Sequence, residues 1–287
     1  MESKIIVITG ASDGIGKYTA TQLAKQGHTI IIHGRNPEKT KAAAEEIINE
    51  TGNKNVKYYL ADFLDFTSIK EFAEKVKHDY DHIDVLINNA GAQFGSARET
   101  TRDGHEKTMM VNVFAPFILT HLLLPSLSKS QAARVVTVSS ASHNMGGQPA
   151  LDDIELEKSY TMPRAYGFSK LYVIWVMRHF IKFANEKGIK NITFNCVHPG
   201  STNSNLGRES TKNWLWWFIY LLWKPMMNSM EDAARPSITC ATSKDLEGVT
   251  GKYYGPKGEE AVYDKFYTVE NEQKVWDYCM DITKQYL

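Results

Sequence analysis

Short apolar runs alternate with longer amphipathic stretches along most of the chain. The runs are rich in Val and Ile, as is typical of strands buried on both faces, and they lie at Lys4–Thr9, Thr29–His33, Val56–Leu60, Asp84–Asn88, Arg134–Ser139 and Ile192–Val197. The stretches between them have helical spacing and cover Gly14–Gln26, Pro37–Glu50, Phe66–His78, Gly104–Leu127 and Ala165–Lys187. This alternation predicts an α/β fold with one doubly wound parallel sheet and helices on both faces. A last helix is expected at Glu270–Leu287, with its apolar stripe packed on the body of the protein or on a partner subunit.

Composition and charge narrow the class of protein. The chain has 287 residues, 43% hydrophobic and 23% charged, which is typical of a globular protein, and we expect one domain over residues 1–287. Lys+Arg and Asp+Glu are both 33, so no overall positive field exists to gather nucleic acid. Three widely spaced cysteines without a CxxC pair predict a reducing compartment, and the scattered histidines give no metal-ligand spacing. Because of this spacing we expect no metal site. The start of the sequence leaves no room for a signal peptide before the first strand, so we expect a cytoplasmic protein.

A glycine-rich turn follows the first predicted strand and opens the first predicted helix. Gly10 permits a tight turn, Gly14 lets the backbone approach a pyrophosphate, and Gly16 lets the helix pack closely on the sheet. Such a turn can be only a turn, but here strand, turn and helix are in register, and the free amides at the helix N-terminus suit a phosphate. The predicted dinucleotide site therefore includes Gly10, Ser12, Asp13, Gly14, Ile15 and Gly16.

The end of the second strand indicates which dinucleotide binds. An acidic residue here would bond a ribose 2′-hydroxyl and favour NAD, but the chain has Gly34 followed by Arg35, whose guanidinium can pair with a 2′-phosphate. We therefore expect NADP, with Asn36 beside Arg35 in the site; the alternative is that Arg35 is a solvated surface residue. Asp62 ends the third strand, next to Phe63, and either accepts from the adenine amino group or caps the following helix.

A tyrosine and a lysine four residues apart mark the chemical end of the expected site, which is the end where the reaction would take place. On a helix, Tyr166 and Lys170 lie on one face, one turn apart. Such a pair is common at protein surfaces, but it becomes informative beside Ser139 and Ser140 at the end of a predicted strand and Asn112 on the preceding helical segment.

The motifs together resemble the short-chain dehydrogenase/reductase superfamily. TGxxxGIG (Thr9–Gly16), NNAG (Asn88–Gly91), Asn112, Ser140, YxxxK (Tyr166–Lys170) and Pro199-Gly200 occur in this order across nearly the whole chain. HGRN, SSASH, LDDIELEKSY, HPG and EGVTGKYY are similar to the retinol-dehydrogenase-like branch of that superfamily. The resemblance implies a Rossmann-like fold and a nicotinamide-dependent oxidoreductase.

The resemblance also assigns roles at the chemical end. It implies that Tyr166 is the general acid that protonates a carbonyl oxygen, helped by the positive charge of Lys170, which favours the phenolate and bonds the nicotinamide ribose. Ser140 would donate to the substrate oxygen, and Asn112 would hold a water that relays protons to Lys170. Ser139 is expected to face the other way, because strand residues alternate.

Further residues enter the expected site by the same resemblance. Asn89, Ala90 and Gly91 would line the cofactor cleft, and Pro199, Gly200 and Thr202 would cover the nicotinamide amide. The chain departs from the branch in lacking the N-terminal membrane anchor of many retinol dehydrogenases, in Leu171-Tyr172-Val173 after the lysine, and in Ser204 at a threonine place. His143 is either a substrate-mouth residue or a plain loop histidine.

An apolar block lies in the segment expected to form the substrate lid, about residues 201–230. Trp214–Trp223 contains four of the six tryptophans and no charge, and it is too short to span a membrane. It is either a buried helix or a lid helix that also docks reversibly on a membrane surface.

We expect an NADP(H)-dependent oxidoreductase that acts on the carbonyl or alcohol of a hydrophobic small molecule of the retinoid, steroid or lipid aldehyde class. The alternatives are a broad quinone or xenobiotic carbonyl reductase and a non-catalytic NADP(H)-binding interaction protein. Because relatives often associate through the two long helices beside the sheet, a homodimer is one expected assembly.

Overall fold

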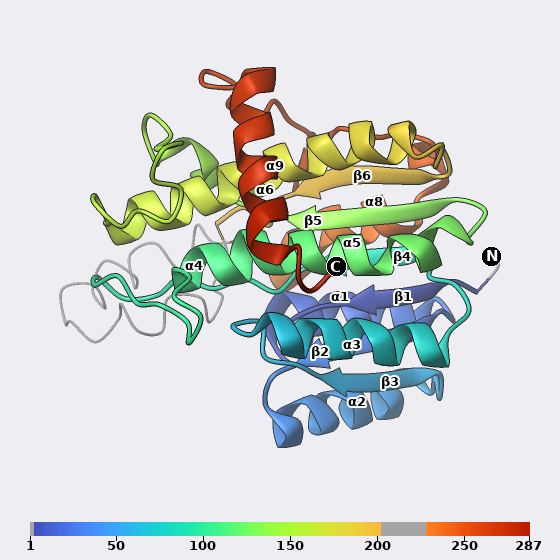
Figure 1. Ribbon diagram of the computed structural model, residues 1–287. Helices are drawn as coiled ribbons and strands as arrows, with labels where there is room; N and C mark the ends of the chain where they lie inside the picture. Colours follow the sequence, from blue (N-terminus) through green and yellow to red (C-terminus); the bar gives the residue numbers. More distant parts are fainter. Residues whose placement is uncertain (1–2, 202–227) are drawn as a thin grey trace.

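The computed structural model describes residues 3–201 and 228–287, and its centre is one eight-stranded sheet (Figure 1). The strands follow the order β3-β2-β1-β4-β5-β6-β7-β8, and all neighbours are parallel except β7 and β8. Their bounds are β1 Ile5–Ile8, β2 Thr29–Gly34, β3 Val56–Leu60, β4 Val85–Asn88, β5 Ala133–Val138, β6 Ile192–Val197, β7 Tyr253–Gly255 and β8 Gly258–Glu259. The six predicted strands are confirmed to within a residue at each end, and the doubly wound α/β fold with them.

Helices cover both faces of the sheet. Packed on one face are α1 (Gly14–Lys25), α2 (Pro37–Thr51) and α8 (Met230–Thr242); packed on the other are α3 (Phe66–Asp79), α5 (Ala115–Ser128) and α6 (Met162–Glu186). Short helical segments lie at α4 (Lys107–Met109), η1 (Met110–Phe114), η2 (Ala141–Asn144) and η6 (Lys244–Leu246). The last helix, α9 (Val269–Thr283), lies across α5 and α6 (Figure 1).

Two apolar cores follow from the alternation of side chains along the strands. In β1, Ile6 and Ile8 join the core beneath α1 and α2, whereas Val7 between them joins the core beneath α3, α5 and α6. All three side chains are fully buried. Because helices cover both faces of the sheet, a central strand such as β1 needs apolar side chains at every position.

Local capping residues set several helix boundaries. The Asn36 side chain accepts from the Lys39 N–H, Pro37 starts α2, and Gly52, at φ +71°, ends it. Asp65 caps α3 by accepting from two backbone N–H groups. The alternative that Asp62 caps this helix is therefore wrong: the chain makes one further turn before α3 begins.

The segment predicted as one helix over Gly104–Leu127 is more complicated. It begins at Lys107, because Gly104 takes a turn conformation with φ +90°, and it passes through the π-helical segment η1 before α5. Among the described residues, Lys107–Ser128 is one helical run long and apolar enough to cross a membrane, but 89% of its apolar window is buried inside the protein. Its apolar side chains therefore belong to the core. The predicted helix at Ala165–Lys187 also differs, since α6 starts earlier, at the Thr161 cap.

The C-terminal helix packs on the body of its own subunit. Trp276 of α9 lies with its ring centroid 5.0 Å from that of Phe117 in α5 and 4.9 Å from that of Phe180 in α6. Helix α9 thus covers part of the outer face of α5 and α6 (Figure 1). The homodimer stays a prediction. The strands β7 and β8 and the helix α8 lie in the C-terminal part of the chain, and we did not predict them.

Candidate active site

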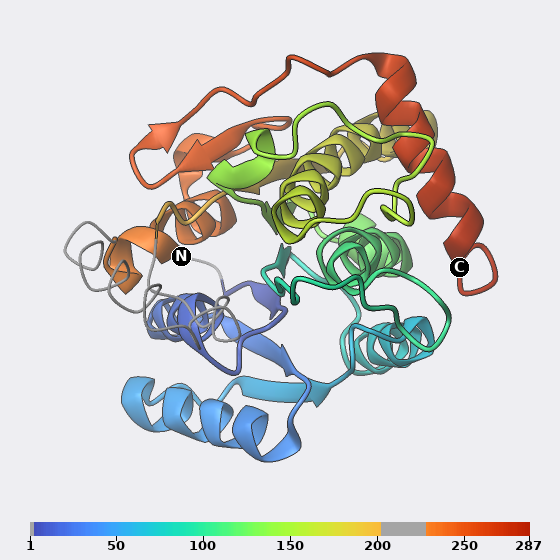
Figure 2. The ribbon, with the colours of Figure 1, turned by 90° about the vertical axis from the view of Figure 1, so that its left-hand side faces the viewer.

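A cleft of about 550 Å³ opens at the carboxyl ends of the parallel strands. Segments that follow β1 through β6 line it, so residues far apart in the sequence meet at one edge of the sheet. Figure 2 shows this edge of the molecule with the strands seen nearly end on. The cleft lies where β1 and β4 are neighbours and the strand order reverses, which is the general place for ligands in such folds.

The glycine turn after β1 has the geometry that each glycine was expected to serve. A Cβ on Gly10 would stand 2.8 Å from the Ala90 Cα, and Gly10 has φ +63°. A Cβ on Gly16 would stand 2.4 Å from the Asn89 amide nitrogen, so α1 can lie this close to the sheet only with glycine there. Gly14, at φ +55°, faces open space, which leaves room for a group that approaches the backbone. The turn therefore fits a pyrophosphate.

The N-terminus of α1 already carries a charged pair. Asp13 caps the helix through Oδ1, which accepts from the Gly14 N–H at 2.7 Å, and its Oδ2 is 2.7 Å from the Lys39 Nζ. Lys39 also lines the cleft, and sequence reasoning missed it. Its position four residues after Arg35, in the first turn of α2, was the available signal. The ammonium balances the carboxylate at a helix end where a phosphate would otherwise meet a negative charge.

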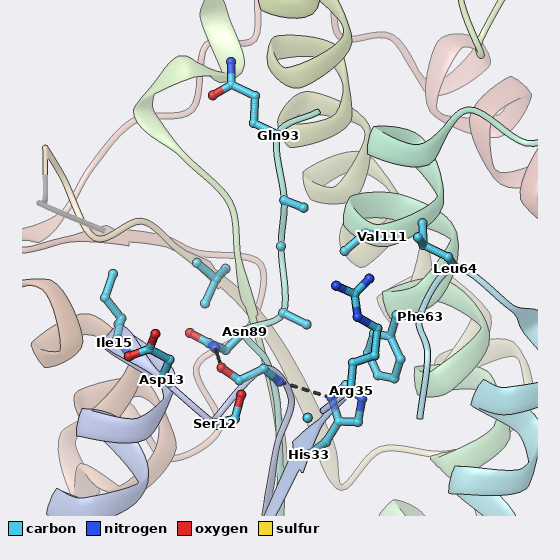
Figure 3. Close-up of a pocket in the computed structure, with 18 of the residues that line it drawn as sticks. Ser12, Asp13, Ile15, His33, Arg35, Phe63, Leu64, Asn89, Gln93 and Val111 are labelled. Atoms are coloured by element: carbon cyan, nitrogen blue, oxygen red, sulfur yellow. Dashed lines mark hydrogen bonds between the residues drawn. The ribbon is translucent and has the colours of Figure 1, made fainter. Parts of the chain in front are cut away.

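A buried histidine supports the glycine turn from below. The Nδ1 of His33 accepts from the Gly10 N–H at 3.2 Å, so Nε2 carries the proton and donates to the Ala61 carbonyl at 3.1 Å. The imidazole stacks on Phe63 with 4.0 Å between ring centroids. Burial lowers the pKa of His33 to about 4, so the ring is neutral near pH 7. Figure 3 shows His33 beneath the glycine turn, with Phe63 beside it.

Arg35 stands across the glycine turn from Asp13 and Ile15 (Figure 3). It is exposed and lines the cleft. A side chain at position 34 has no room, because a Cβ there would lie 2.2 Å from the Thr40 Oγ1. Local packing therefore excludes the carboxylate that would bond a 2′-hydroxyl from this position.

Of two further residues expected in the cofactor site, Asp62 and Asn36, only Asp62 lines the cleft. Asp62 lines the cleft, and its Oδ1 accepts from the Leu64 N–H at 3.0 Å. Asn36 lies outside the lining of the cleft, because its side chain caps α2. The capping role was not foreseen, and the place of Asn36 in the cofactor site stays a prediction.

The segment after β4 is tied to the segment after β1. The Thr9 Oγ1 accepts from the N–H groups of Asn89 and Ala90 at 3.0 and 2.9 Å. The Asn89 Nδ2 donates to the carbonyl oxygens of Thr9 and Gly10 at 2.8 and 3.2 Å. Asn89, Ala90 and Gly91 all line the cleft as expected. The bonds hold this segment against the glycine turn, at the end of the cleft where the phosphates are expected.

Lys170 is buried at the chemical end of the cleft. Its Nζ donates to the Val138 carbonyl at 3.0 Å, and burial lowers its pKa to about 8. A Cβ on Gly91 would stand 3.2 Å from this nitrogen and 3.1 Å from the Asn112 Oδ1, so the lysine and the asparagine meet at Gly91. The Ser139 Oγ donates to the Lys170 carbonyl at 2.7 Å, which holds α6 against the end of β5. Ser139 itself lines the cleft, contrary to the expectation that it faces the other way.

Tyr166 lies in the same cleft with its phenol next to Ser140. Burial raises the pKa of Tyr166, and a side-chain hydrogen bond with Ser140 acts in the opposite direction without overcoming it. The Lys170 Nζ is 5.8 Å from the Tyr166 ring centroid. The phenol therefore holds its proton near pH 7. The role of Lys170 in favouring the phenolate stays a prediction.

Asn112 sits in the π-helical segment η1, and its side chain is fully engaged. Oδ1 accepts from the Ala92 N–H at 2.9 Å, and Nδ2 donates to the Ala92 carbonyl at 2.9 Å and the Ser169 Oγ at 3.0 Å. The amide thus fixes the chain just after Gly91 to α6. The water relay through Asn112 stays a prediction.

The turn after β6 completes the described part of the cleft. Pro199 lines it, whereas Gly200, at φ +69°, lies just outside the lining and donates its N–H to the Nδ1 of His198 at 3.1 Å. Thr202, the block Trp214–Trp223 and most of the expected lid lie outside the described residues. Within residues 3–201 and 228–287, no group of three or more His, Cys, Asp or Glu side chains is placed to hold a metal ion.

Comparisons with known proteins match this arrangement. The family profile described as "short chain dehydrogenase" matches residues 4–214. Retinol dehydrogenase 12 of Mus musculus is 35% identical over 279 residues, covering 97% of this chain and 86% of that protein. Polyprenol dehydrogenase of Homo sapiens is 33% identical, covering 98% and 85%. A short-chain dehydrogenase from Shigella flexneri, solved in complex with NADP, has a TM-score of 0.69 and 25% identity, covering 90% of this chain and 98% of its own.

The family profile, the relatives and the cleft lead to the same assignment. The matched region contains the glycine turn, the Asn89–Gly91 wall and the grouping of Ser140, Tyr166 and Lys170. Members of this family are oxidoreductases that bind a nicotinamide cofactor. The chain belongs to the short-chain dehydrogenase family, in its retinol-dehydrogenase-like branch.

Proposed function

We propose that the protein is an NADP(H)-dependent oxidoreductase that transfers a hydride between nicotinamide and the carbonyl or alcohol of a hydrophobic small molecule. One observation carries this proposal: a protonated phenol (Tyr166) that is hydrogen-bonded to Ser140 and a buried ammonium (Lys170) line one end of a cleft whose other end has the glycine turn. A dinucleotide that spans this cleft has its phosphates at one end and its reactive ring at the other.

NADP is the dinucleotide that the residues at the phosphate end favour. Arg35 and Lys39 offer two cations beside the expected ribose, while packing against Thr40 keeps position 34 without a carboxylate. Guanidinium and ammonium groups pair with a 2′-phosphate, whereas a 2′-hydroxyl needs an acceptor. The Shigella flexneri structure in complex with NADP supports this choice.

The residues at the chemical end suit a proton transfer that accompanies hydride transfer. When bound, the cofactor supplies or accepts the hydride. Tyr166 donates its proton to the carbonyl oxygen in reduction, and its raised pKa keeps that proton available near pH 7. Ser140, hydrogen-bonded to the phenol, donates to the same oxygen and stabilises its developing charge. Lys170 binds the ribose and supplies positive charge near the phenol.

We propose an apolar substrate of the retinoid, steroid or lipid aldehyde class. Leu64, Phe94 and Val111 add apolar surface to the lining of the cleft. The names of two relatives, retinol dehydrogenase and polyprenol dehydrogenase, both denote long isoprenoid alcohols. We further propose that residues 201–230 form a lid and that Trp214–Trp223 contacts a membrane surface, where such substrates accumulate; the protein is then cytoplasmic and peripheral.

The test is a substrate panel with the purified full chain. Retinal, a long-chain aldehyde, a steroid ketone and a small quinone are each supplied with NADPH and with NADH, and the loss of nicotinamide absorbance is followed. Turnover of the apolar carbonyls with NADPH supports the proposal. Preference for the quinone identifies a broad carbonyl reductase instead. Tight NADPH binding without turnover of any carbonyl or alcohol identifies a binding protein.

A further inference from the structure

We propose that His143 is a positioning residue that fixes Ser140 by joining it to the C-terminal segment at Tyr263. This inference rests on the proposed function, because it gives Ser140 its role in the reaction. The sequence left two alternatives for His143, a substrate-mouth residue and a plain loop histidine, and its surroundings fit neither. It is 6% exposed, so it is not a substrate-mouth residue, and both its ring nitrogens are bonded, so it is not a plain loop residue.

The hydrogen bonds of the ring determine its protonation state. The Tyr263 backbone N–H can only donate, and it points to the Nε2 of His143 at 2.9 Å. Nε2 must therefore be an acceptor, which places the proton on Nδ1. Nδ1 lies 2.8 Å from the Ser140 carbonyl oxygen and donates to it. Burial lowers the pKa of His143, which agrees with a neutral ring.

These bonds act on the residue that bears the catalytic hydroxyl. Ser140 is the extended residue that precedes η2, and its Oγ also accepts from the Ser142 N–H at 3.1 Å. Its carbonyl accepts from the His143 N–H at 3.1 Å as well as from the ring. The backbone bonds are local to one short turn, whereas the ring ties that turn to a chain segment 120 positions away. The His143 ring therefore sets where Ser140 stands relative to the body of the protein.

The C-terminal segment also contacts a second turn of the cleft, the one that contains Pro199 and Gly200. The His143 ring packs edge-on against Tyr253 of β7 at 5.3 Å, and Tyr253 stacks on His198 at 5.2 Å. The Nδ1 of His198 accepts from Gly200, and its Nε2 is 2.9 Å from the Glu260 carboxylate. Residues 260–263 thus hold both the Ser140 turn and the turn of Pro199 and Gly200.

Three variants of His143 separate the bond to Ser140 from the bond to Tyr263; the Tyr253 hydroxyl is a third, longer contact, 3.4 Å from Nδ1. His143→Asn places an amide near the position of Nδ1 and keeps the bond to Ser140, whereas His143→Gln places its amide near Nε2 and loses that bond. His143→Leu loses both bonds. We expect kcat to fall about tenfold to 10²-fold in the Leu variant, as misplacement of a catalytic group does. The Asn and Gln variants should show a loss of the same order, because each breaks one end of the link between Ser140 and Tyr263. The dissociation constant of NADPH should change less than twofold.

The matched control is His179→Asn. His179 is equally buried, bonded to Glu272 at 3.0 Å and stacked on Trp276, but it lies away from the cleft. We expect this variant to lower Tm and leave kcat unchanged. Equal kcat values for wild type and all three His143 variants, or a kcat that follows Tm across both positions, overturn the inference.

A measurement without turnover keeps the inference testable by itself. The ¹⁵N shifts of the His143 ring in the wild-type protein with NADPH report which nitrogen holds the proton. We expect a neutral ring protonated on Nδ1. A proton on Nε2 overturns the inference even if the enzyme is active. A wild-type protein that reduces no carbonyl in the panel instead overturns the proposed function, and the ring measurement still decides the geometry.

Discussion

Two cations at the phosphate end of the cleft are expected to act differently on dinucleotide binding. Arg35 is exposed and lines the cleft across from Asp13, so it can pair with a 2′-phosphate directly. Lys39 lines the same cleft, but its Nζ is already 2.7 Å from the Asp13 carboxylate. Removal of Arg35 should therefore affect NADPH alone, whereas removal of Lys39 should expose the negative charge of Asp13 to both dinucleotides.

The size of each effect follows from this geometry. A charge-assisted hydrogen bond contributes about 1.5–3 kcal/mol, and solvent screening at exposed Arg35 favours the lower end, or roughly a tenfold change in affinity. We expect Arg35→Ala to weaken NADPH about tenfold and NADH less than twofold. Lys39→Ala should weaken both, and Asp13→Asn added to it should restore NADH binding, because the amide keeps the helix cap without the charge.

The assay is a titration of both dinucleotides against each variant, followed by nicotinamide fluorescence. Lys41→Ala is the matched control, since Lys41 lies on the same helix, pairs with Glu45 and does not line the cleft. An Arg35→Ala variant with the full preference for NADPH would refute the assignment of the 2′-phosphate to Arg35. Wild-type protein that binds NADH as tightly as NADPH would refute the NADP assignment.

Two further predictions concern the chemical end and the lid. The kcat/KM for NADPH in carbonyl reduction should fall as pH rises through about 8, because Lys170 loses its charge there; a profile that stays flat to pH about 9 would contradict this role. Replacing Trp216, Trp217 and Leu221 with Ser should raise the KM of long apolar carbonyls and leave small carbonyls unaffected, if the block contacts substrate. A triple variant that unfolds would instead identify the block as core, and one that folds with every KM unchanged would exclude it from substrate binding.

The fold was predictable because its signals are local. Each strand from β1 to β6 is a short Val- and Ile-rich run, and α2 has its start marked by Asn36 and Pro37 and its end by Gly52. The signals for β7 and β8 are weak, since they have three and two residues and are stabilised by pairing with β6 and with each other. The π-helical turn that places Asn112 also lacked a local signal.

The candidate site was predictable where a motif carried it, and missed where distant contacts decide it. The glycine turn and the Tyr166–Lys170 pair are visible as spacings. The roles of His33, Lys39 and His143 depend on Gly10, Asp13 and Tyr263, which only the folded chain brings to them. Asn36 is a different case, because its bond to the Lys39 N–H is local and one residue type serves both as a helix cap and as a ligand.

The central claim is that Tyr166 transfers a proton during hydride transfer. Tyr166→Phe removes the phenol proton and leaves the ring in its buried place. With NADPH and the best apolar carbonyl of the panel, we expect kcat to fall by at least about 10²-fold, the usual contribution of general acid–base catalysis, with the NADPH dissociation constant within about twofold of wild type. A Phe variant that keeps near-wild-type kcat would contradict the account.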